Sequence, residues 1–265
     1  MKTELKENER IDDLEYKGLK IIQNTEGFCF GIDAVLLSDF AKEIKNNSKV
    51  LDLGTGTGIL SILLSAKTNL GKIYGIEIQE EVADMAKRSV RLNGLENKIE
   101  IINKNIKDLE EIFEKNTFDA IVTNPPYKKM ETGIINEKQN KFISRHEVTA
   151  SLNDFIKISS NLLKERGSLY IVHRPERLAE IIYELKNNKL EPKKMRFVHS
   201  NVNEEPKLVL IKAVKNAKEF LKIEKPLFIY NKQGEYTKEI LEIYNRGVNG
   251  DQGREGENDE TEIYT

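Results

Sequence analysis

The stretch "VLDLGTGTGILSI" (residues 50–62) decides the fold, because it joins a buried strand, a glycine turn and the start of a helix. Glycines stand at every second position, Gly54, Gly56 and Gly58, and glycine lets a backbone take positive φ and approach a ligand closely. A dinucleotide-binding fingerprint needs a glycine where this sequence has Ile59. The turn therefore suits a ligand without a pyrophosphate, and Asp52 at the end of the strand would attract a cationic one.

Short apolar strands alternate with amphipathic helices on both sides of this stretch, which is typical of a parallel sheet with helices on both faces. The sequence predicts strands at 49–54, 72–77, 99–103, 118–123, 167–173, 195–200 and 207–214, and helices near 33–45, 58–68, 80–94, 106–116, 151–165 and 175–188. Only "NVNEEP" separates the last two strands, which is too short for a helical crossover, so they should pair antiparallel. The predicted fold class is α/β, with a seven-stranded, mostly parallel sheet.

Polar residues follow the next two strands at the expected ligand edge of this sheet. Glu77 ends the second strand, where a doubly wound sheet places an acid on a ribose hydroxyl. Asn105 follows the third strand and has two equally supported interpretations: a hydrogen bond to an adenine amino group, or the N-cap of a helix that begins at Ile106.

The stretch "TNPPYKK" (123–129) follows the fourth predicted strand, at the same edge of the sheet. Its two prolines remove backbone N–H donors and fix φ, so the Asn124 side-chain carbonyl and the Pro125 backbone carbonyl are left as acceptors. These acceptors match the two hydrogens of an exocyclic amino group, and Tyr127 offers a flat face for stacking on a base. We expect the corner Asn124, Pro125, Pro126 and Tyr127 to be the catalytic site.

These motifs resemble the class I S-adenosylmethionine-dependent methyltransferases over about residues 30–214. The resemblance implies a Rossmann-like sheet of strand order 3-2-1-4-5-7-6 with the last strand antiparallel, S-adenosylmethionine as cofactor and S-adenosylhomocysteine as product. It implies a cofactor site formed by Phe30, Asp33, Asp52, Gly54, Gly56, Gly58, Glu77, Ile78, Asn105 and Asn124. Asp33 could equally be only a helix N-cap. The family usually has an aspartate where Asn105 stands, which leaves its contact with the cofactor adenine open.

The flanking segments favour one substrate class. "GFCFGIDAVLLSDFA" (27–41), "RHE" (145–147), "RPERL" (174–178) and "RFVHS" (196–200) resemble the bacterial family that methylates N6 of the adenine 3′ of the anticodon of tRNA(Val). Protein glutamine-N5 methyltransferases and DNA adenine-N6 methyltransferases share the corner and remain alternatives. The glutamine enzymes typically carry a separate N-terminal helical domain, for which we expect too few residues here. A non-catalytic RNA-binding protein is a further alternative, and Ile59 disfavours a nucleotide-linked dehydrogenase.

Charge is distributed unevenly along the 265 residues, although the formal net charge is only −2. Basic residues gather in 128–145 and 186–196, where they are either a solvated surface or a face for a polyanion. The RNA-binding candidates are Lys128, Lys129, Lys141, Arg145, Arg174 and Arg177, although Arg174 and Arg177 could as well pair with neighbouring glutamates. tRNA is therefore the expected partner.

The remaining expectations concern organisation and setting. We expect an N-terminal extension (1–30), a methyltransferase domain (31–214), a strand–helix appendage (215–245) and a disordered acidic tail (246–265). A single cysteine, Cys29, and three scattered histidines predict no disulfide and no metal site. The charged N-terminus and the lack of a long apolar run predict a cytoplasmic protein without a membrane segment, and we expect a monomer.

Overall fold

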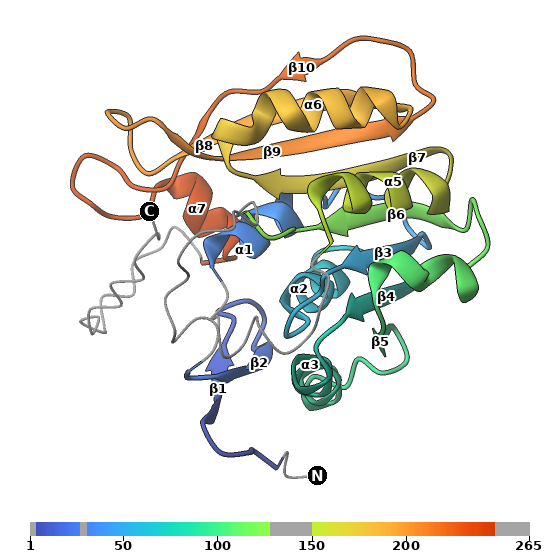
Figure 1. Cartoon of the computed structure of the whole chain (residues 1–265). Coiled ribbons are helices and arrows are strands. Elements are labelled where there is room, and N and C mark those ends of the chain that lie inside the picture. Colours follow the sequence, from blue (N-terminus) through green and yellow to red (C-terminus); the bar gives the residue numbers. More distant parts are fainter. Residues whose placement is uncertain (1–3, 27–30, 128–149, 247–265) are drawn as a thin grey trace, which may run out of the picture.

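The computed structural model describes residues 4–26, 31–127 and 150–246, which form one large sheet with helices on both faces (Figure 1). The strands are β1 (Glu9–Asp13), β2 (Lys20–Asn24), β3 (Lys49–Leu53), β4 (Lys72–Glu77), β5 (Ile99–Asn103), β6 (Phe118–Thr123), β7 (Leu163–His173), β8 (Leu190–His199), β9 (Pro206–Lys215), β10 (Lys222–Ile223) and β11 (Leu227–Phe228). The α-helices are α1 (Ile32–Phe40), α2 (Ile59–Lys67), α3 (Glu80–Leu92), α5 (Leu152–Leu162), α6 (Leu178–Asn187) and α7 (Lys238–Ile243), and the 3₁₀ helices are η1 (Ile106–Glu111) and η2 (Pro175–Arg177).

The large sheet has the order β10-β8-β9-β7-β6-β3-β4-β5, and β11 also pairs with β8. The seven predicted strands correspond to β3 to β9 in the expected order. β9 lies between β7 and β8 and is antiparallel to both, whereas β7, β6, β3, β4 and β5 pair in parallel. The predicted fold class, with its antiparallel last strand, is therefore confirmed.

Two apolar cores lie on the two faces of the sheet, because side chains alternate along each strand. Val50 of β3 joins the core beneath α1, α2, α3 and α7, whereas Leu51 joins the core beneath η1, α5 and α6. Both side chains are fully buried. Strands that are buried on both faces form a rigid platform, and the loops at their carboxyl ends are positioned by it.

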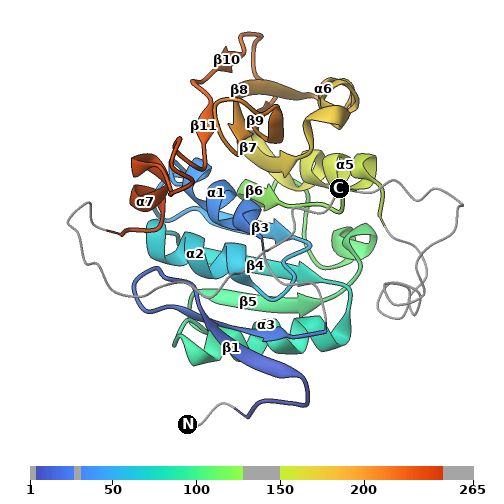
Figure 2. The same cartoon turned by 90° about the vertical axis from the view of Figure 1, so that its left-hand side faces the viewer.

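The N-terminal segment contains a β-hairpin, which the sequence pattern does not predict. β1 and β2 pair antiparallel and lie against α3 (Figure 2). Arg88 of α3 donates two hydrogen bonds of 2.6 Å to the Glu9 carboxylate of β1, and the Ile22 N–H of β2 donates to the Ser89 hydroxyl at 2.9 Å. Both strands are short and β1 is mostly polar, so the sequence pattern is weak. Burial of Ile21 and Ile22 of β2, together with the contacts with α3, stabilises the hairpin.

One predicted helix differs from the structure. The segment 106–116, predicted to be an α-helix, forms the 3₁₀ helix η1 over Ile106–Glu111. Phe113 instead makes edge contacts with Phe118 and Tyr74, with ring centroids 4.9 and 5.3 Å apart. The partly buried ring of Phe113 thus packs in an aromatic cluster beyond the end of η1.

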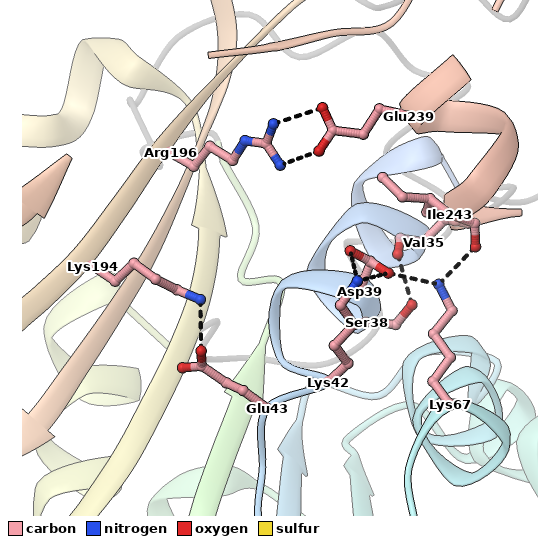
Figure 3. A network of polar contacts seen from close by, with 10 residues as sticks. All are labelled: Val35, Ser38, Asp39, Lys42, Glu43, Lys67, Lys194, Arg196, Glu239 and Ile243. Atoms are coloured by element: carbon pink, nitrogen blue, oxygen red, sulfur yellow. Dashed lines mark hydrogen bonds and ion pairs between the residues drawn. The ribbon is translucent and has the colours of Figure 1, made fainter. Parts of the chain in front are cut away.

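The last described helix is tied to the body of the protein by polar contacts between distant segments (Figure 3). Arg196 of β8 and Glu239 of α7 form a paired contact with distances of 2.8 and 2.9 Å. The Lys67 ammonium of α2 donates to the Ile243 backbone carbonyl at 3.1 Å. These contacts fix α7 against β8 and α2.

Candidate active site at the carboxyl ends of the strands

The glycine turn links β3 to α2 and has three residues in the left-handed region. φ is 71° at Gly54, 57° at Gly56 and 91° at Gly58. A side chain would be strained at each position, and the space around a Cβ built at Gly56 is open to 4 Å. The Thr55 N–H donates to the Ile76 carbonyl at 2.9 Å, so the turn is fastened to β4. The result is an exposed backbone cradle above the ends of β3 and β4.

Asp52 lies beneath this turn and holds it together. Its side chain is 1% exposed and accepts hydrogen bonds from the Thr55 hydroxyl at 2.6 Å and the Ser61 hydroxyl at 2.8 Å. Burial raises the pKa of Asp52 to about 6, against the opposing effect of these hydroxyl donors. Sequence reasoning missed the roles of Thr55 and Ser61, although hydroxyls this close to a buried acid are a usable signal.

Glu77 lies directly beside the glycine turn, as its position at the end of β4 predicts. Its carboxylate accepts from the backbone N–H of Gly56 at 3.1 Å and from that of Gln79 at 2.9 Å. Burial raises the pKa of Glu77, and these N–H donors oppose the shift. Ile78, the next residue, leaves its apolar side chain 38% exposed at the same edge. The arrangement places a carboxylate and an apolar surface next to the cradle.

The two asparagines at the end of β5 and just after it have different partners. Asn103, which sequence reasoning missed, donates from its amide to the carbonyls of Glu77 and Ile78, both at 2.9 Å. Asn105 accepts from the Lys107 N–H at 3.0 Å and is the N-cap of η1. The prediction that Asn105 is a helix N-cap is therefore confirmed. A hydrogen bond from the cofactor adenine to Asn105 stays a prediction.

The Asn124–Tyr127 corner follows β6, and the Tyr127 hydroxyl lies between the side chains of Asn124 and Asp33 of α1. The Tyr127 hydroxyl contacts the Asn124 side-chain oxygen at 2.8 Å and also hydrogen-bonds to the Asp33 carboxylate. The Thr123 hydroxyl donates to the Leu53 carbonyl at 2.8 Å, which ties the corner to the strand that carries the glycine turn. Pro125 is buried and Pro126 is exposed. Because α1 begins at Ile32 with Gly31 as its N-cap, the interpretation of Asp33 as only an N-cap is wrong, and its carboxylate contacts the corner instead.

Residues at the end of β7 hold the ring of Tyr127. The ring centroids of Tyr127 and His173 are 5.0 Å apart, and the Arg174 guanidinium lies 5.3 Å from the Tyr127 ring. Arg177 donates to the Tyr127 carbonyl at 3.4 Å and pairs with Glu180 at 2.6 Å. Arg177 was predicted either to bind RNA or to pair with a neighbouring glutamate, and the ion pair with Glu180 is present. Both Arg174 and Arg177 also contact Tyr127.

His173 is unsuited to act as a general base here. It is fully buried, its Nδ1 accepts from the Arg174 N–H at 2.8 Å, and its Nε2 has no hydrogen-bond partner in the described protein. Burial, followed by the positive charge of Arg177, lowers the pKa of His173 to about 4. The imidazole is therefore neutral at pH 7, with its proton on Nε2.

Several predicted residues lie outside the described ranges. They are Phe30 of the cofactor set and Lys128, Lys129, Lys141 and Arg145 of the RNA-binding set. The second basic segment, 186–196, is described, and its charges are largely paired within the protein. Lys186 pairs with Glu191 at 2.8 Å, Lys194 with Glu43 at 2.9 Å, and Arg196 with Glu239. This segment is a weaker candidate for a polyanion surface than its composition indicates.

A cavity of about 210 Å³ lies between α1, α7 and β8. None of the predicted site residues lines it, and Glu43, Lys194, Arg196 and Glu239 in its wall form the ion pairs described above. It lies away from the glycine turn.

Over residues 4–26, 31–127 and 150–246, no three His, Cys, Asp or Glu side chains gather as metal ligands, and no helix is long and apolar enough to cross a membrane.

Comparison with known families decides the class of protein. The family described as "Methyltransferase small domain" matches residues 31–198. The chain belongs to this family. The predicted enzyme class, a methyltransferase, and the predicted cofactor, S-adenosylmethionine, are therefore confirmed.

Individual relatives of this methyltransferase agree with that assignment. It is 29% identical over 204 residues to a Porphyromonas gingivalis protein named tRNA1(Val) (adenine(37)-N6)-methyltransferase, covering 75% of this chain and 79% of the relative. A Haemophilus influenzae protein of the same name is 26% identical over 229 residues, covering 86% of this chain and 94% of the relative. The crystal structure of a predicted O-methyltransferase from Agrobacterium tumefaciens superposes with a TM-score of 0.66 at 20% identity, covering 83% of this chain and all of that one.

The buried acid under the glycine turn predicts an unusual dependence of stability on pH. Because the pKa of Asp52 is raised from 3.8 to about 6, the folded protein binds more protons than the unfolded chain between these values. The contribution of Asp52 to the free energy of unfolding should therefore fall by about 3 kcal/mol as pH rises through this window. Glu77, whose pKa is also raised, acts in the same direction.

Denaturant unfolding of the wild type and of Asp52→Asn between pH 4 and 7 measures this contribution. The asparagine has no charge to bury, so the difference in unfolding free energy between the two proteins should change with pH and level off above pH 6. Parallel curves over the whole range would show that Asp52 is not the responsible group.

Proposed function

We propose that this methyltransferase modifies the exocyclic N6 of an adenine in tRNA, and that its specific substrate is the adenine 3′ of the anticodon of tRNA(Val). The observation that carries the proposal is the junction of Asn124, Tyr127 and Asp33 beside the glycine turn. The names of the P. gingivalis and H. influenzae relatives support tRNA as the substrate.

We also propose that residues 31–214 are the catalytic domain, that 215–245 are an appendage to it, and that the enzyme acts in the cytoplasm as a monomer.

The residues around the turn fit the cofactor. The open backbone at Gly56 leaves room for a ligand, the Glu77 carboxylate can accept from ribose hydroxyls, and Ile78 offers an apolar surface to a purine. Asp52 acts from beneath, by holding the turn and adding negative charge near a cationic ligand. When bound, S-adenosylmethionine supplies a methyl group on a positively charged sulfur.

The corner residues would position the acceptor nitrogen. The Asn124 side-chain oxygen and the Pro125 carbonyl can each accept one hydrogen of the adenine amino group, which fixes the direction of its lone pair. The Tyr127 ring, held by Asp33 and packed near His173, can stack on the base. No strong base is needed before attack, because the methyl group is already activated, and the buried neutral His173 agrees with that.

The same corner could serve a glutamine amide or an adenine in DNA, so the substrate must be tested directly. The decisive experiment is transfer of labelled methyl to tRNA from cells that lack this enzyme, followed by nucleoside analysis. Methylated adenine in the tRNA(Val) fraction is expected. Duplex DNA and a protein release factor are assayed in parallel, and methyl transfer to either of them but not to tRNA would overturn the proposal. Binding of tRNA without methyl transfer would favour the non-catalytic alternative.

RNA binding should depend on salt through the basic residues that follow the corner. We expect neutralisation of Lys128, Lys129, Lys141 and Arg145 to reduce the slope of log affinity against log salt, by up to ~0.7 for each phosphate that the variant no longer neutralises. A suitable control neutralises Lys45, Lys98 and Lys115, which are exposed at the opposite edge of the sheet. Equal slopes in the test variant and the wild type would mean that the test set is a solvated surface.

A further inference from the structure

Three tyrosines of the C-terminal segment are stacked on one another. The rings of Tyr230 and Tyr236 have centroids 5.4 Å apart and planes inclined by 11°. The rings of Tyr236 and Tyr244 are 5.9 Å apart and inclined by 17°. These values describe offset stacking, and Tyr236 is the middle ring of the three. We call Tyr230, Tyr236 and Tyr244 the tyrosine stack.

The two ends of the tyrosine stack differ. At one end, Tyr244 is half-buried, burial raises its pKa, and the Arg246 guanidinium lies 5.6 Å from its ring. At the other end, Tyr230 is 37% exposed, and in the described part of the chain its only ring neighbour is Tyr236. One end of the stack is therefore closed by a cation, and the other presents an aromatic ring at the surface.

Backbone pairing places the exposed end at the same edge of the sheet as the active site. β11 runs parallel to β8, and the N–H groups of Ile229 and Tyr230 donate to the carbonyls of His199 and Ser200 at 2.9 and 2.8 Å. Tyr230 therefore lies beyond the carboxyl end of β8, the end at which the parallel strands carry the glycine turn and the Asn124–Tyr127 corner. Tyr236, Tyr244 and Tyr127 also pack against the same apolar core, on the α1 face of the sheet.

The tyrosine stack is held rigidly by the contacts of α7. Glu239 of this helix pairs with Arg196, and the Ile243 carbonyl accepts from Lys67 (Figure 3). Thr237, the N-cap of α7, donates to the Phe228 carbonyl at 2.7 Å, and Tyr230 and Tyr236 form an isolated β-bridge. Rings fixed in this way lose little conformational freedom when a further flat group is added to the stack.

We propose that Tyr230 binds an unpaired nucleobase of the RNA substrate, which extends the tyrosine stack by one ring. The proposal rests on the proposed function, because a tRNA loop is the source of the base. Every nucleobase has a flat π face, so stacking on an aromatic side chain is sequence-tolerant and suits a second contact away from the methylated adenine. Lys232 is exposed in the turn between Tyr230 and Tyr236 and adds positive charge near a bound strand, whereas Lys238, also exposed, lies 3.9 Å from Glu242.

Binding of the unmodified tRNA(Val) anticodon stem-loop to the wild type and four variants tests this contact. Tyr230→Ala and Tyr230→Leu remove the flat ring, Tyr230→Phe keeps it, and Tyr183→Ala removes a tyrosine that is 64% exposed on α6. We expect Tyr230→Ala and Tyr230→Leu to bind about fivefold more weakly or worse, and Tyr230→Phe and Tyr183→Ala to stay within about twofold of the wild type. Tyr230→Leu retains apolar bulk, so it still tests the contact if the alanine variant is poorly folded.

Kinetics separate this inference from the proposed function. The Tyr230→Ala and Tyr230→Leu variants should raise KM for RNA and leave both the single-turnover rate at saturating RNA and the affinity for S-adenosylmethionine unchanged. If the wild type methylates tRNA and Tyr230→Leu binds the stem-loop as tightly as the wild type, the stacking contact is wrong and the proposed function stands. A wild type that neither binds nor methylates tRNA would refute the proposed function itself. If the Tyr230 variants bind RNA as tightly as the wild type but bind a protein partner more weakly, the tyrosine stack is a protein-binding surface and the inference is wrong.

Discussion

Replacement of Asn124 by alanine is expected to lower the single-turnover rate of methyl transfer to tRNA by ~10²–10³-fold, the usual cost of removing one preorganised polar contact from a reacting group. In the structure the Asn124 oxygen is already oriented by the Tyr127 hydroxyl at 2.8 Å, so the acceptor is in place before the substrate arrives. Alanine deletes the acceptor and leaves the glycine turn and Glu77 untouched. The decrease should therefore appear in the rate, with cofactor affinity nearly unchanged.

The measurement is single-turnover methylation of tRNA by excess enzyme at saturating cofactor, with Asn97→Ala as a control, since Asn97 is exposed in the loop before β5. Two changes at Tyr127 refine the result. Tyr127→Phe should be mild because the ring still stacks, whereas Tyr127→Ala should be severe because it removes both the ring and its packing near His173. If Asn124→Ala transfers methyl at the wild-type rate, the corner is only a turn and the proposed mechanism is wrong.

The second large effect is expected at the cofactor. Glu77→Ala should weaken the binding of S-adenosylmethionine by more than tenfold, equivalent to ~1.4 kcal/mol or above, because it removes charge-assisted hydrogen bonds to the ribose. The structure adds a second reason, since the same carboxylate accepts from the Gly56 N–H at 3.1 Å and so helps to fix the turn.

Calorimetric titration with the cofactor measures this effect. Glu77→Gln retains an acceptor and the side-chain volume, so its affinity should fall less than that of the alanine variant. Glu100→Ala removes an exposed carboxylate from β5, which pairs with β4, and is the control for loss of a surface carboxylate near the same strands. Unchanged affinity in Glu77→Ala would remove this residue from the cofactor site.

Strands β3 to β9 were predictable from periodicity, which is a local signal, whereas their order came from the family resemblance and β10 at the edge was not predicted. The antiparallel pairing of β9 followed from a loop too short for a crossover, and the closeness of Glu77 to the glycine turn followed from the parallel strands. Contacts between distant side chains were not predictable in this way. Asp33 and Tyr127 are 94 positions apart, and the choice of Asn105 as a cap depends on its rotamer.

The position of Asp52 shows the same limit at short range. The residue type and its place near the end of the strand correctly indicate that Asp52 lies beside the turn. They do not indicate the direction of the carboxylate, which points to the hydroxyls of Thr55 and Ser61. The N-terminal hairpin was missed because its strands are short and its stability comes from contacts with distant segments: the hydrogen bonds to Arg88 and Ser89 on α3 and the burial of Ile21 and Ile22.

The order of strands in the sheet also constrains the order in which the protein can mature on the ribosome. β9 is made after β7 and β8 but is inserted between them, so the edge of β7 stays open and β8 has no neighbour until residues 206–215 have left the exit tunnel. A nascent chain that pauses before this point exposes an unpaired apolar strand edge, the kind of surface that chaperones bind and that leads to aggregation. The half of the sheet from β3 to β7 can assemble during synthesis, whereas the half that carries the tyrosine stack must wait for its last long strand.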